Sequence, residues 1–369
     1  MPYQKEENKI FWNALNLIKG LGPKNMQILA NFFSSAQNIW KASKKDLEKT
    51  NLSSSLIEKI IQQRKNINPE REWQKLLQHQ IKILTIEEEN YPQLLKEIPN
   101  PPFLIYYKGN GLFNQAPALA IVGSRKFTSY GKQVAYSLTK ELVQAGITIV
   151  SGMALGIDSI AHKASLENQG TTFAILGNSL EDKFIYPRNH FHLAQQIQEQ
   201  GLLISDYPLG TPASSYTFPA RNRLMAGLTL GTIIIEATRK SGTLITARLA
   251  LEFNREVFAV PGSILSPSSF GPHKLIQQGA KLVTQTQDIL NELNLTSFAK
   301  EKEKRKKEYQ DKLSQEEKKI IQHLSQEPLH INQLAQLSHL EISTLTSFLT
   351  LLEIKNLIKD IGGKNYILL

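Results

Sequence analysis

The 369 residues exceed the roughly 100–200 of an ordinary domain, so we expect two or three domains. A composition of 41% hydrophobic and 21% charged residues is typical of a globular protein, and the lack of cysteine excludes disulfides, thiolate nucleophiles and cysteine-ligated metals. The net charge of +10 favours an anionic partner, but it is spread as +5 over residues 1–110, +3 over 111–295 and +2 over 296–369, so charge alone does not identify that partner.

The first part of the chain has the apolar spacing of helices. This spacing runs from Ile10 to Phe33 and from Leu47 to Ile61, and it predicts a helical arrangement for residues 10–90. Trp40 and Trp73 are expected to anchor its core. We therefore predict a helical domain of SAM or helix-hairpin-helix type over residues 1–95.

A glycine turn lies between the first two of these helices. Gly20-Leu21-Gly22-Pro23 pairs two glycines with a proline at the first helical position. Such a turn exposes backbone N–H groups at a helix start, which is how a helix-hairpin-helix contacts DNA phosphates. A plain turn between packed helices explains the same residues at least as well.

From about Ala116 short apolar runs alternate with amphipathic stretches, which predicts βα units. The result is an α/β fold: an extended Rossmann-like domain with a mostly parallel sheet over residues 96–295. The predicted strands are Leu119–Gly123, Ile147–Ser151, Thr172–Leu176, Leu202–Ser205, Thr232–Glu236, Val257–Val260 and Lys281–Val283. The predicted helices between them include Tyr130–Ala145, Ile157–Gln169, Arg221–Leu228 and Leu244–Asn254.

The last part of the chain predicts a winged helix over residues 313–369. Lysines and glutamates without apolar periodicity over residues 299–312 indicate a linker or a solvated helix, and we assign a charged linker to 296–312. The helices and strands expected after it are Ser314–Leu324, Ile331–Leu337, Ile342–Ile354, Leu357–Ile361 and Tyr366–Leu369, the strands being joined at Gly362-Gly363. The third helix has no arginine that could read bases, so protein binding or weak backbone contact fits as well as duplex readout.

Small residues and one cation follow the predicted strands. Ligands gather at the carboxyl ends of parallel strands, where the next helices present free N–H groups. Glycine permits close approach to an anion, Ser and Thr donate hydrogen bonds, and Arg125 supplies a forked cation suited to phosphate. Five turns at one edge predict a polyanion site: those beginning at Gly123, Gly152, Gly177, Ala237 and Pro261.

Two further segments combine arginines with aromatic rings. They are Tyr186-Pro187-Arg188-Asn189 and the run from Tyr216 to Arg223, which contains Phe218 and Arg221. Guanidinium groups suit phosphates and rings suit unpaired bases, so both segments favour single-stranded nucleic acid. Alternatively, Phe218 belongs to the core and Arg221 or Arg223 pairs with Glu236 as a structural lock. Arg223 is as readily structural as functional.

Other chemistries have weaker support. Neither a phosphate-binding G-x-x-x-x-G-K-[ST] loop nor a strict G-x-G-x-x-G fingerprint occurs. Asp158 and His162 lie four apart on one predicted helix face, as metal ligands do, but a helix-dipole partner beside a packed histidine explains the pair better. We expect neither a metal nor a cofactor.

The ordered motifs together resemble the DNA-processing protein DprA (Smf) family over about residues 100–290. The resemblance rests on Gly123-Ser124-Arg125, Tyr130-Gly131, Ser151-Gly152-x-Ala154-x-Gly156-Ile157-Asp158, Tyr186-Pro187, Phe218-Pro219-x-Arg221-Asn222-Arg223, Ser241-Gly242-Thr243 and Val260-Pro261-Gly262. It implies a non-enzymatic protein that binds single-stranded DNA, loads the recombinase RecA during natural transformation, and forms a homodimer through its Rossmann domain.

The same resemblance assigns roles to individual residues. Arg125 matches the family's phosphate-binding arginine, and Arg188 lies near a second basic contact. The full predicted DNA-binding set is Gly123, Ser124, Arg125, Gly152, Gly156, Arg188, Phe218, Arg221, Arg223, Ser241, Gly242 and Thr243. Since no apolar run reaches the roughly 20 residues of a membrane helix, we expect a cytoplasmic protein without membrane contact.

Two other functions remain open. Glu236 to Thr246 also resembles the phosphate loop of Rossmann nucleoside-monophosphate phosphoribohydrolases, although the Gly-Gly pair and the downstream acid of those enzymes are missing. A protein-interaction scaffold with a vestigial pocket is the third possibility. It predicts no salt-sensitive DNA affinity.

Overall fold

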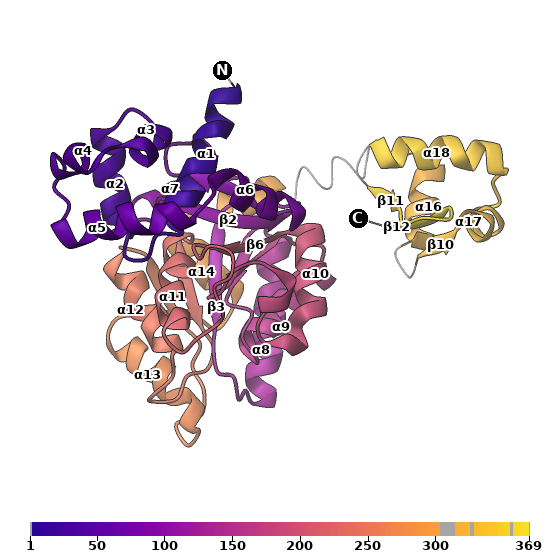
Figure 1. Cartoon of the computed structure of the whole chain (residues 1–369). Helices are drawn as coiled ribbons and strands as arrows, with labels where there is room; N and C mark the ends of the chain where they lie inside the picture. Colours follow the sequence, from indigo (N-terminus) through magenta and orange to yellow (C-terminus); the bar gives the residue numbers. More distant parts are fainter. Residues whose placement is uncertain (1, 303–313, 325–327, 355–356, 369) are drawn as a thin grey trace. The chain divides into compact units, whose positions relative to one another are not determined.

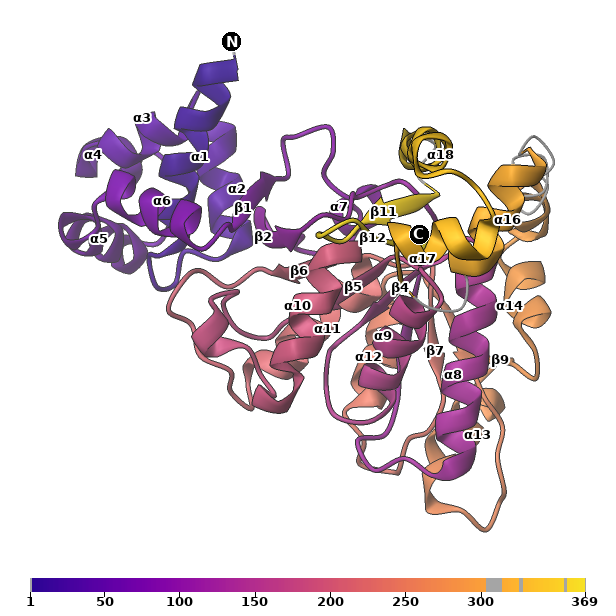
Figure 2. The ribbon, with the colours of Figure 1, turned by 90° about the vertical axis from the view of Figure 1, so that its right-hand side faces the viewer.

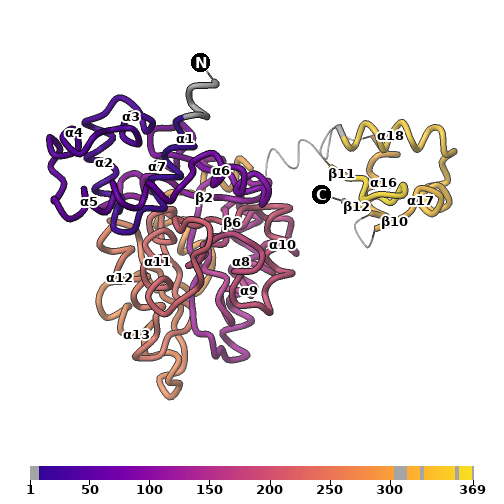
Figure 3. The backbone as a smooth tube through the Cα atoms, in the orientation of Figure 1, coloured from indigo at the N-terminus to yellow at the C-terminus, as the bar shows by residue number. Residues whose placement is uncertain are grey.

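The computed structural model describes residues 2–302, 314–324, 328–354 and 357–368; Figure 1 draws the rest as a thin grey trace, and Figure 3 shows the course of the backbone as a tube. Contacts divide the chain into two compact units, Met1–Leu295 and Thr296–Leu369. The helical part expected over residues 1–95 and the Rossmann-like part expected over 96–295 thus belong to one unit, and the boundary between them stays a prediction. Of the expected charged linker, residues 303–312 lie outside the described residues.

A nine-stranded sheet forms the centre of the first unit, in the order β1-β2-β6-β5-β4-β3-β7-β8-β9. The seven strands from β3 to β9 are parallel and match the seven predicted strands. The bounds are β1 Lys82–Thr85, β2 Leu104–Gly109, β3 Ala118–Val122, β4 Thr148–Ser151, β5 Thr172–Ile175, β6 Leu202–Ser205, β7 Gly231–Ile234, β8 Glu256–Ala259 and β9 Lys281–Leu282.

The helical prediction for residues 10–90 is wrong at its end, because Lys82–Thr85 is β1. This strand pairs antiparallel with β2, which in turn pairs antiparallel with β6. Ile83 and Leu84 are buried, and so short an apolar run does not distinguish a strand from a helix turn by periodicity. The two added strands extend the parallel sheet at its β6 side.

Helices cover both faces of the sheet. Figure 2 shows α8 and α9 side by side on one face, while Figure 1 shows α11 and α12 on the other. The bounds are α8 Ser129–Gln144, α9 Ile157–Glu167, α10 Phe191–Gln200, α11 Thr217–Gly227, α12 Thr243–Glu252, α13 Phe270–Gln277 and α14 Thr286–Glu292, with short 3-10 helices at Asp182–Phe184, Arg188–His190 and Pro267–Ser269.

The strand order reverses between β3 and β7. The chain runs outward from β3 through β4 and β5 to β6, then returns to β7 beside β3 and runs outward the other way through β8 and β9. The loops after β3 and β7 therefore lead to helices on opposite faces, which opens a crevice between them. The candidate site is expected at this point.

The N-terminal helices pack on one another around a core of their own residues and β1–β2. Trp12 is the buried tryptophan, 2% exposed, with its ring centroid 4.1 Å from that of Phe103. Trp40 and Trp73, the expected anchors, pack against this core but are only partly buried. The bounds are α1 Pro2–Asn16, α2 Pro23–Phe32, α3 Ala36–Lys41, α4 Lys44–Glu48, α5 Ser54–Gln63, a 3-10 helix Arg64–Asn66, α6 Pro69–Gln78 and α7 Gln93–Lys96.

The second unit is a winged helix, as predicted. A three-stranded sheet of order β10-β12-β11 packs with three helices around buried Ile320, Leu334 and Leu349. The bounds are α16 Gln315–Leu324, β10 Leu329–His330, α17 Ile331–Ser338, α18 Ile342–Ile354, β11 Ile358–Asp360 and β12 Asn365–Leu368. Within the described ranges, no helix in either unit is long and apolar enough to cross a membrane.

Candidate functional site

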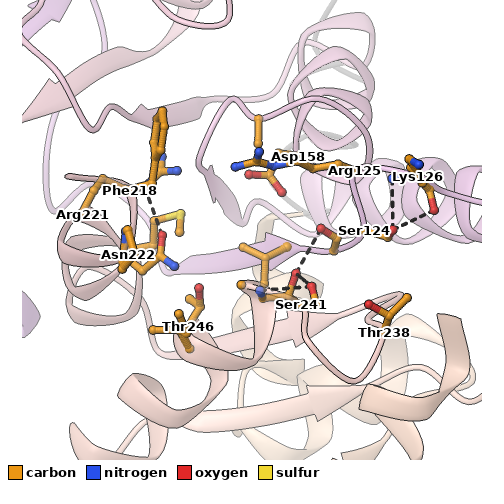
Figure 4. A pocket seen from close by; sticks show the side chains of 18 of the residues that line it. Ser124, Arg125, Lys126, Asp158, Phe218, Arg221, Asn222, Thr238, Ser241 and Thr246 are labelled. Carbon is orange, nitrogen blue, oxygen red and sulfur yellow. Dashed lines mark hydrogen bonds between the residues drawn. The ribbon is translucent and has the colours of Figure 1, made fainter. Parts of the chain in front are cut away.

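A pocket of about 610 Å³ opens where β3 and β7 end, at the reversal of strand order (Figure 4). The loops after β3, β4 and β7 and the start of α11 and α12 supply its walls. Its lining residues are Val122, Gly123, Ser124, Arg125, Lys126, Ala154, Asp158, Ser215, Phe218, Pro219, Arg221, Asn222, Met225, Thr238, Ser241, Gly242, Thr243, Ile245 and Thr246. Eight of the twelve predicted site residues are among them.

Arg125 is an exposed cation at this pocket. The turn that carries it is fixed by Ser124, whose Oγ donates to the Lys126 carbonyl at 2.7 Å and accepts the Lys126 N–H at 3.1 Å. Among the described residues, no carboxylate lies within ion-pair distance of the Arg125 guanidinium. The guanidinium lies beside the Phe218 ring, 6.0 Å from Cζ to the centroid. This guanidinium is therefore available for an external anion.

Hydroxyl groups and a helix start form the opposite wall. Ser241 Oγ donates to Thr243 Oγ1 at 2.9 Å, and Thr243 Oγ1 donates to the Gly123 carbonyl at 3.1 Å, which joins the turn after β7 to the turn after β3. Gly242 lies exposed between them, and a Cβ there would meet no atom within 4 Å. Because α12 begins at Thr243, the positive end of its dipole favours an anion at this wall, while the N–H groups of Thr243, Leu244 and Ile245 already donate to Ser241 and Gly242.

The pocket floor contains a buried cation. Arg221 is 5% exposed, donates to the Gly152 carbonyl at 2.8 Å and contacts the Ile175 carbonyl. Burial lowers the pKa of Arg221 to about 10, an effect that nearby Asp158 opposes. Since the pKa stays well above neutrality, Arg221 adds a fixed positive charge under the pocket while its donors are held by the protein.

Asp158 lies at the start of α9 and balances part of that charge. Its Oδ2 accepts the Gly152 N–H at 3.1 Å. Burial raises the pKa of Asp158, while Arg221 and backbone N–H groups lower it. Asp158 therefore acts as an internal acceptor that holds the turn after β4.

The proposed pairing of Arg221 or Arg223 with Glu236 is wrong. Arg223 forms an ion pair with Asp206 and donates to the Asn100 carbonyl at 3.1 Å, outside the pocket lining. Glu236 instead accepts hydrogen bonds from the Thr128 N–H and hydroxyl and from the Ser268 hydroxyl. Glu236 thus holds the segment that follows Arg125.

Two more predicted residues lie beside the pocket rather than in its wall. Arg188 is exposed, donates to the Asp182 carbonyl at 2.6 Å and covers the Phe191 ring at 4.6 Å. Gly156 has a φ of +92°, and a Cβ there would lie 2.3 Å from the Ser124 carbonyl oxygen. Gly156 therefore shapes the contact between the β4 turn and the Arg125 turn.

An aromatic group borders the pocket beside Gly152. Phe218 and Tyr186 have ring centroids 5.5 Å apart, and both line a smaller cavity together with Gly152 and Leu155. Tyr186 is half exposed and Tyr216 is 86% exposed. The rings of Phe218 and Tyr186 offer faces on which flat ligands can stack next to Arg125.

Of the five turns predicted to form the polyanion site, three line the pocket. The turns after β5 and β8 do not. Conversely, the sequence prediction missed Lys126, Asn222, Thr238 and Thr246. Lys126 could have been found as the neighbour of Arg125. Thr238 belongs to the predicted turn that begins at Ala237. Asn222 and Thr246 required knowing which faces of α11 and α12 point into the crevice.

The Asp158–His162 pair is not a metal site. His162 is fully buried, and its Nδ1 lies 2.7 Å from Thr172 Oγ1. Burial lowers the pKa of His162 to about 3, so the ring stays neutral. Within the described ranges, no group of three or more His, Asp or Glu side chains could hold a metal ion.

Comparison with known proteins identifies similar families for both units. The family described as DNA recombination-mediator protein A matches residues 82–294, and the DprA winged helix domain matches residues 304–364. Protein Smf of Synechocystis is 36% identical, covering 96% of this chain and 98% of that protein. The DNA processing protein DprA of Bacillus subtilis is 44% identical over 58% of this chain and 71% of its own length.

Solved structures agree with these sequence matches. DNA processing protein A from Streptococcus pneumoniae superimposes with a TM-score of 0.67 at 33% identity, covering 77% of this chain and 97% of that one. The protein from Helicobacter pylori gives a TM-score of 0.51 at 33% identity, covering 58% of this chain and 95% of its own. The latter structure concerns a single-stranded DNA binding mode.

Proposed function

The chain belongs to the DNA recombination-mediator protein A (DprA/Smf) family, whose role is in DNA processing, and from this premise we propose that its pocket binds single-stranded DNA. The observation that carries this proposal is the combination at Arg125. An exposed guanidinium free of carboxylate partners among the described residues faces the start of α12 and borders the rings of Phe218 and Tyr186. The guanidinium and the start of α12 suit a phosphate, and the two rings suit unpaired bases.

The pocket is larger than a phosphate group requires. Its volume of about 610 Å³ lies within the roughly 300–1,000 Å³ of small-molecule sites. Asn222 and Thr246, each at most 9% exposed, place polar groups on the lining beside Met225. We infer that the pocket admits one nucleotide of the strand, with its phosphate at Arg125 and its base further in.

Salt and substitution test this proposal. Binding of labelled oligo-dT should weaken steeply as salt rises, because each neutralised phosphate releases counterions. Arg125→Ala should lose about tenfold or more in affinity, as expected for the loss of a charge-assisted hydrogen bond of about 1.5–3 kcal/mol, and Arg125→Lys should retain part of the affinity. Arg248→Ala is the matched control, since Arg248 is exposed on α12 and pairs with Glu252 at 3.3 Å.

The proposal fails if Arg125→Ala binds oligo-dT as tightly as the unaltered chain does. Equal affinity for single-stranded and duplex DNA of one length would also contradict it, because paired bases cannot enter the pocket or stack on the rings. If Arg248→Ala lost as much affinity as Arg125→Ala, the binding would depend on the net positive charge of the surface and not on a specific site.

We propose that the chain acts without catalysis and helps load the recombinase RecA onto the bound strand. The two carboxylates near the pocket support the first part. Asp158 is 6% exposed and accepts the Gly152 N–H, and Glu236 is 3% exposed and accepts from Thr128 and Ser268, so both hold turns of the protein. Release of free base from a nucleoside monophosphate by the purified protein would favour the phosphoribohydrolase alternative instead.

Two assembly proposals complete this function. The first is a homodimer through the Rossmann-like domain, which light scattering of the purified chain should report as twice the chain mass of 41.6 kDa. The second is contact with RecA, in the cytoplasm: filament formation on coated single strands should become faster when the chain is added. A monomer, or an unchanged filament rate, would remove the respective proposal.

A further inference from the structure

Four exposed apolar side chains lie on two segments, the one that follows Arg125 and the loop after β8. Phe127 and Tyr130 lie two and five residues after Arg125 and are 43% and 47% exposed. Ile264 and Leu265, on the loop after β8 that protrudes beside α13 in Figure 1, are each 88% exposed. We call these four residues the apolar track.

Hydrogen bonds join the two segments of the apolar track. The Tyr130 hydroxyl donates to the Pro261 carbonyl at 2.8 Å, and a Cβ on Gly262 would lie 3.9 Å from the Tyr130 ring. Glu236 accepts from Thr128 in one segment and from Ser268 in the other. These contacts hold the two segments of the apolar track next to one another, and the first segment adjoins the pocket at Lys126.

The apolar track lies among positively charged side chains, which favours an anionic partner. Residues 123–132 and 260–274 contain no aspartate or glutamate, whereas Arg125, Lys126, Lys132 and Lys274 are exposed cations within them. Apolar groups beside cations suit a strand whose phosphates face guanidinium or ammonium groups while its bases contact rings and aliphatic side chains. A duplex, with its bases stacked on one another, cannot use such a surface in this way.

We propose that the apolar track holds the nucleotides that leave the pocket, with bases stacking on Phe127 and Tyr130 and then contacting the Ile264–Leu265 tip. This inference rests on the proposed function and extends it. The pocket fixes one nucleotide, and the apolar track sets the direction in which the strand continues along the sheet edge. The rings of Phe218 and Tyr186 would contact bases at the opposite side of the pocket.

Oligonucleotide length separates the track from the pocket. An oligo-dT of about four nucleotides should engage the pocket, and one of about sixteen should also reach the track. Phe127→Ala, and the double change Ile264→Ser with Leu265→Ser, should lower affinity for the long oligonucleotide about tenfold and leave the short one unchanged. Arg125→Ala should weaken both.

Two variants serve as matched controls. Tyr136→Ala removes a ring that is 40% exposed further along α8, and Leu112→Ser removes an apolar side chain that is 60% exposed in the loop before β3, at the opposite edge of the sheet. Both should bind long and short oligonucleotides as the unaltered chain does. A 2-aminopurine placed a few nucleotides from the end should lose fluorescence on binding, and regain it in Phe127→Ala.

Other outcomes would overturn the track while leaving the pocket in place. The track would be overturned if the Phe127→Ala chain and the Ile264→Ser/Leu265→Ser chain bound the long oligonucleotide as tightly as the unaltered chain does. A change of oligomeric state in the double variant, with DNA affinity unchanged, would show that a second copy of the chain covers the tip. If Arg125→Ala also binds normally at both lengths, the pocket itself is misassigned.

Discussion

Four arginines predicted to contact DNA have different surroundings in the folded chain. Arg221 is buried and held by backbone carbonyls, Arg223 is paired with Asp206, and Arg188 covers the Phe191 ring. Arg125 is free of carboxylate partners among the described residues. Because a guanidinium already engaged by the protein has few donors left, Arg125 is the one expected to dominate phosphate affinity.

Gly152 shows how tightly the protein encloses the Arg221 guanidinium. A Cβ at position 152 would lie 2.6 Å from the Arg221 Nη atoms. Gly152→Ala should therefore displace a buried cation and lower the free energy of unfolding by about 1–3 kcal/mol, measured by urea denaturation. Gly242→Ala, where the Cβ meets open space, is the control and should change stability little. Equal stability of the two variants would contradict the described enclosure.

The position of α12 determines much of the site. Its first residue, Thr243, donates to the Gly123 carbonyl, so the helix start is fixed against the Arg125 turn across the reversal of strand order. Parallel strands direct the N-terminus of each following helix toward the same edge, and at β3 and β7 these helices lie on opposite faces. A pocket with the positive end of a helix dipole on one wall and a cation on the other follows from this topology.

An acidic residue at the start of α12 separates binding from stability. Gly242→Asp should leave the free energy of unfolding unchanged or raise it by about 0.3–1 kcal/mol, because a negative charge interacts favourably with a helix N-terminus. The same charge should repel phosphate and weaken oligo-dT binding. Gly242→Asn is the neutral control of similar size. If Gly242→Asp binds as tightly as Gly242→Asn does, phosphate does not approach this wall.

At the scale of the molecule, each unit has its own core. The pocket and apolar track belong entirely to Met1–Leu295, whereas Ile320, Leu334 and Leu349 form a separate core in the second unit. On the exposed face of α18, the hydroxyls of Thr346 and Thr350 donate to carbonyls four residues earlier, so these donors are already used within the helix.

Removing the second unit should leave the site functional. A chain ending at Leu295 should unfold cooperatively and bind the short oligo-dT with the affinity of the full chain, since none of the pocket residues is lost. Circular dichroism melting and fluorescence anisotropy would measure the two quantities. A folded truncated chain that has lost this affinity would contradict the assignment of the site to the first unit alone.

The sequence by itself determined the seven parallel strands, the winged helix and the Arg125 turn. Each depends on a local pattern: an apolar run, a helical repeat, or a glycine–serine–arginine turn at a strand end. Such patterns reflect which backbone conformations neighbouring residues permit and which side chains must leave water, so they can be recognised without knowing what packs against them.

Only the tertiary structure decided which predicted residues share the pocket. It added β1 and β2, buried Arg221 beneath the pocket, paired Arg223 with Asp206, and brought Thr128 and Ser268 together on Glu236. These arrangements join residues far apart in the chain. They depend on which strands are neighbours and which helix faces meet, and the burial of a charge is settled by that long-range packing rather than by the residues next to it in sequence.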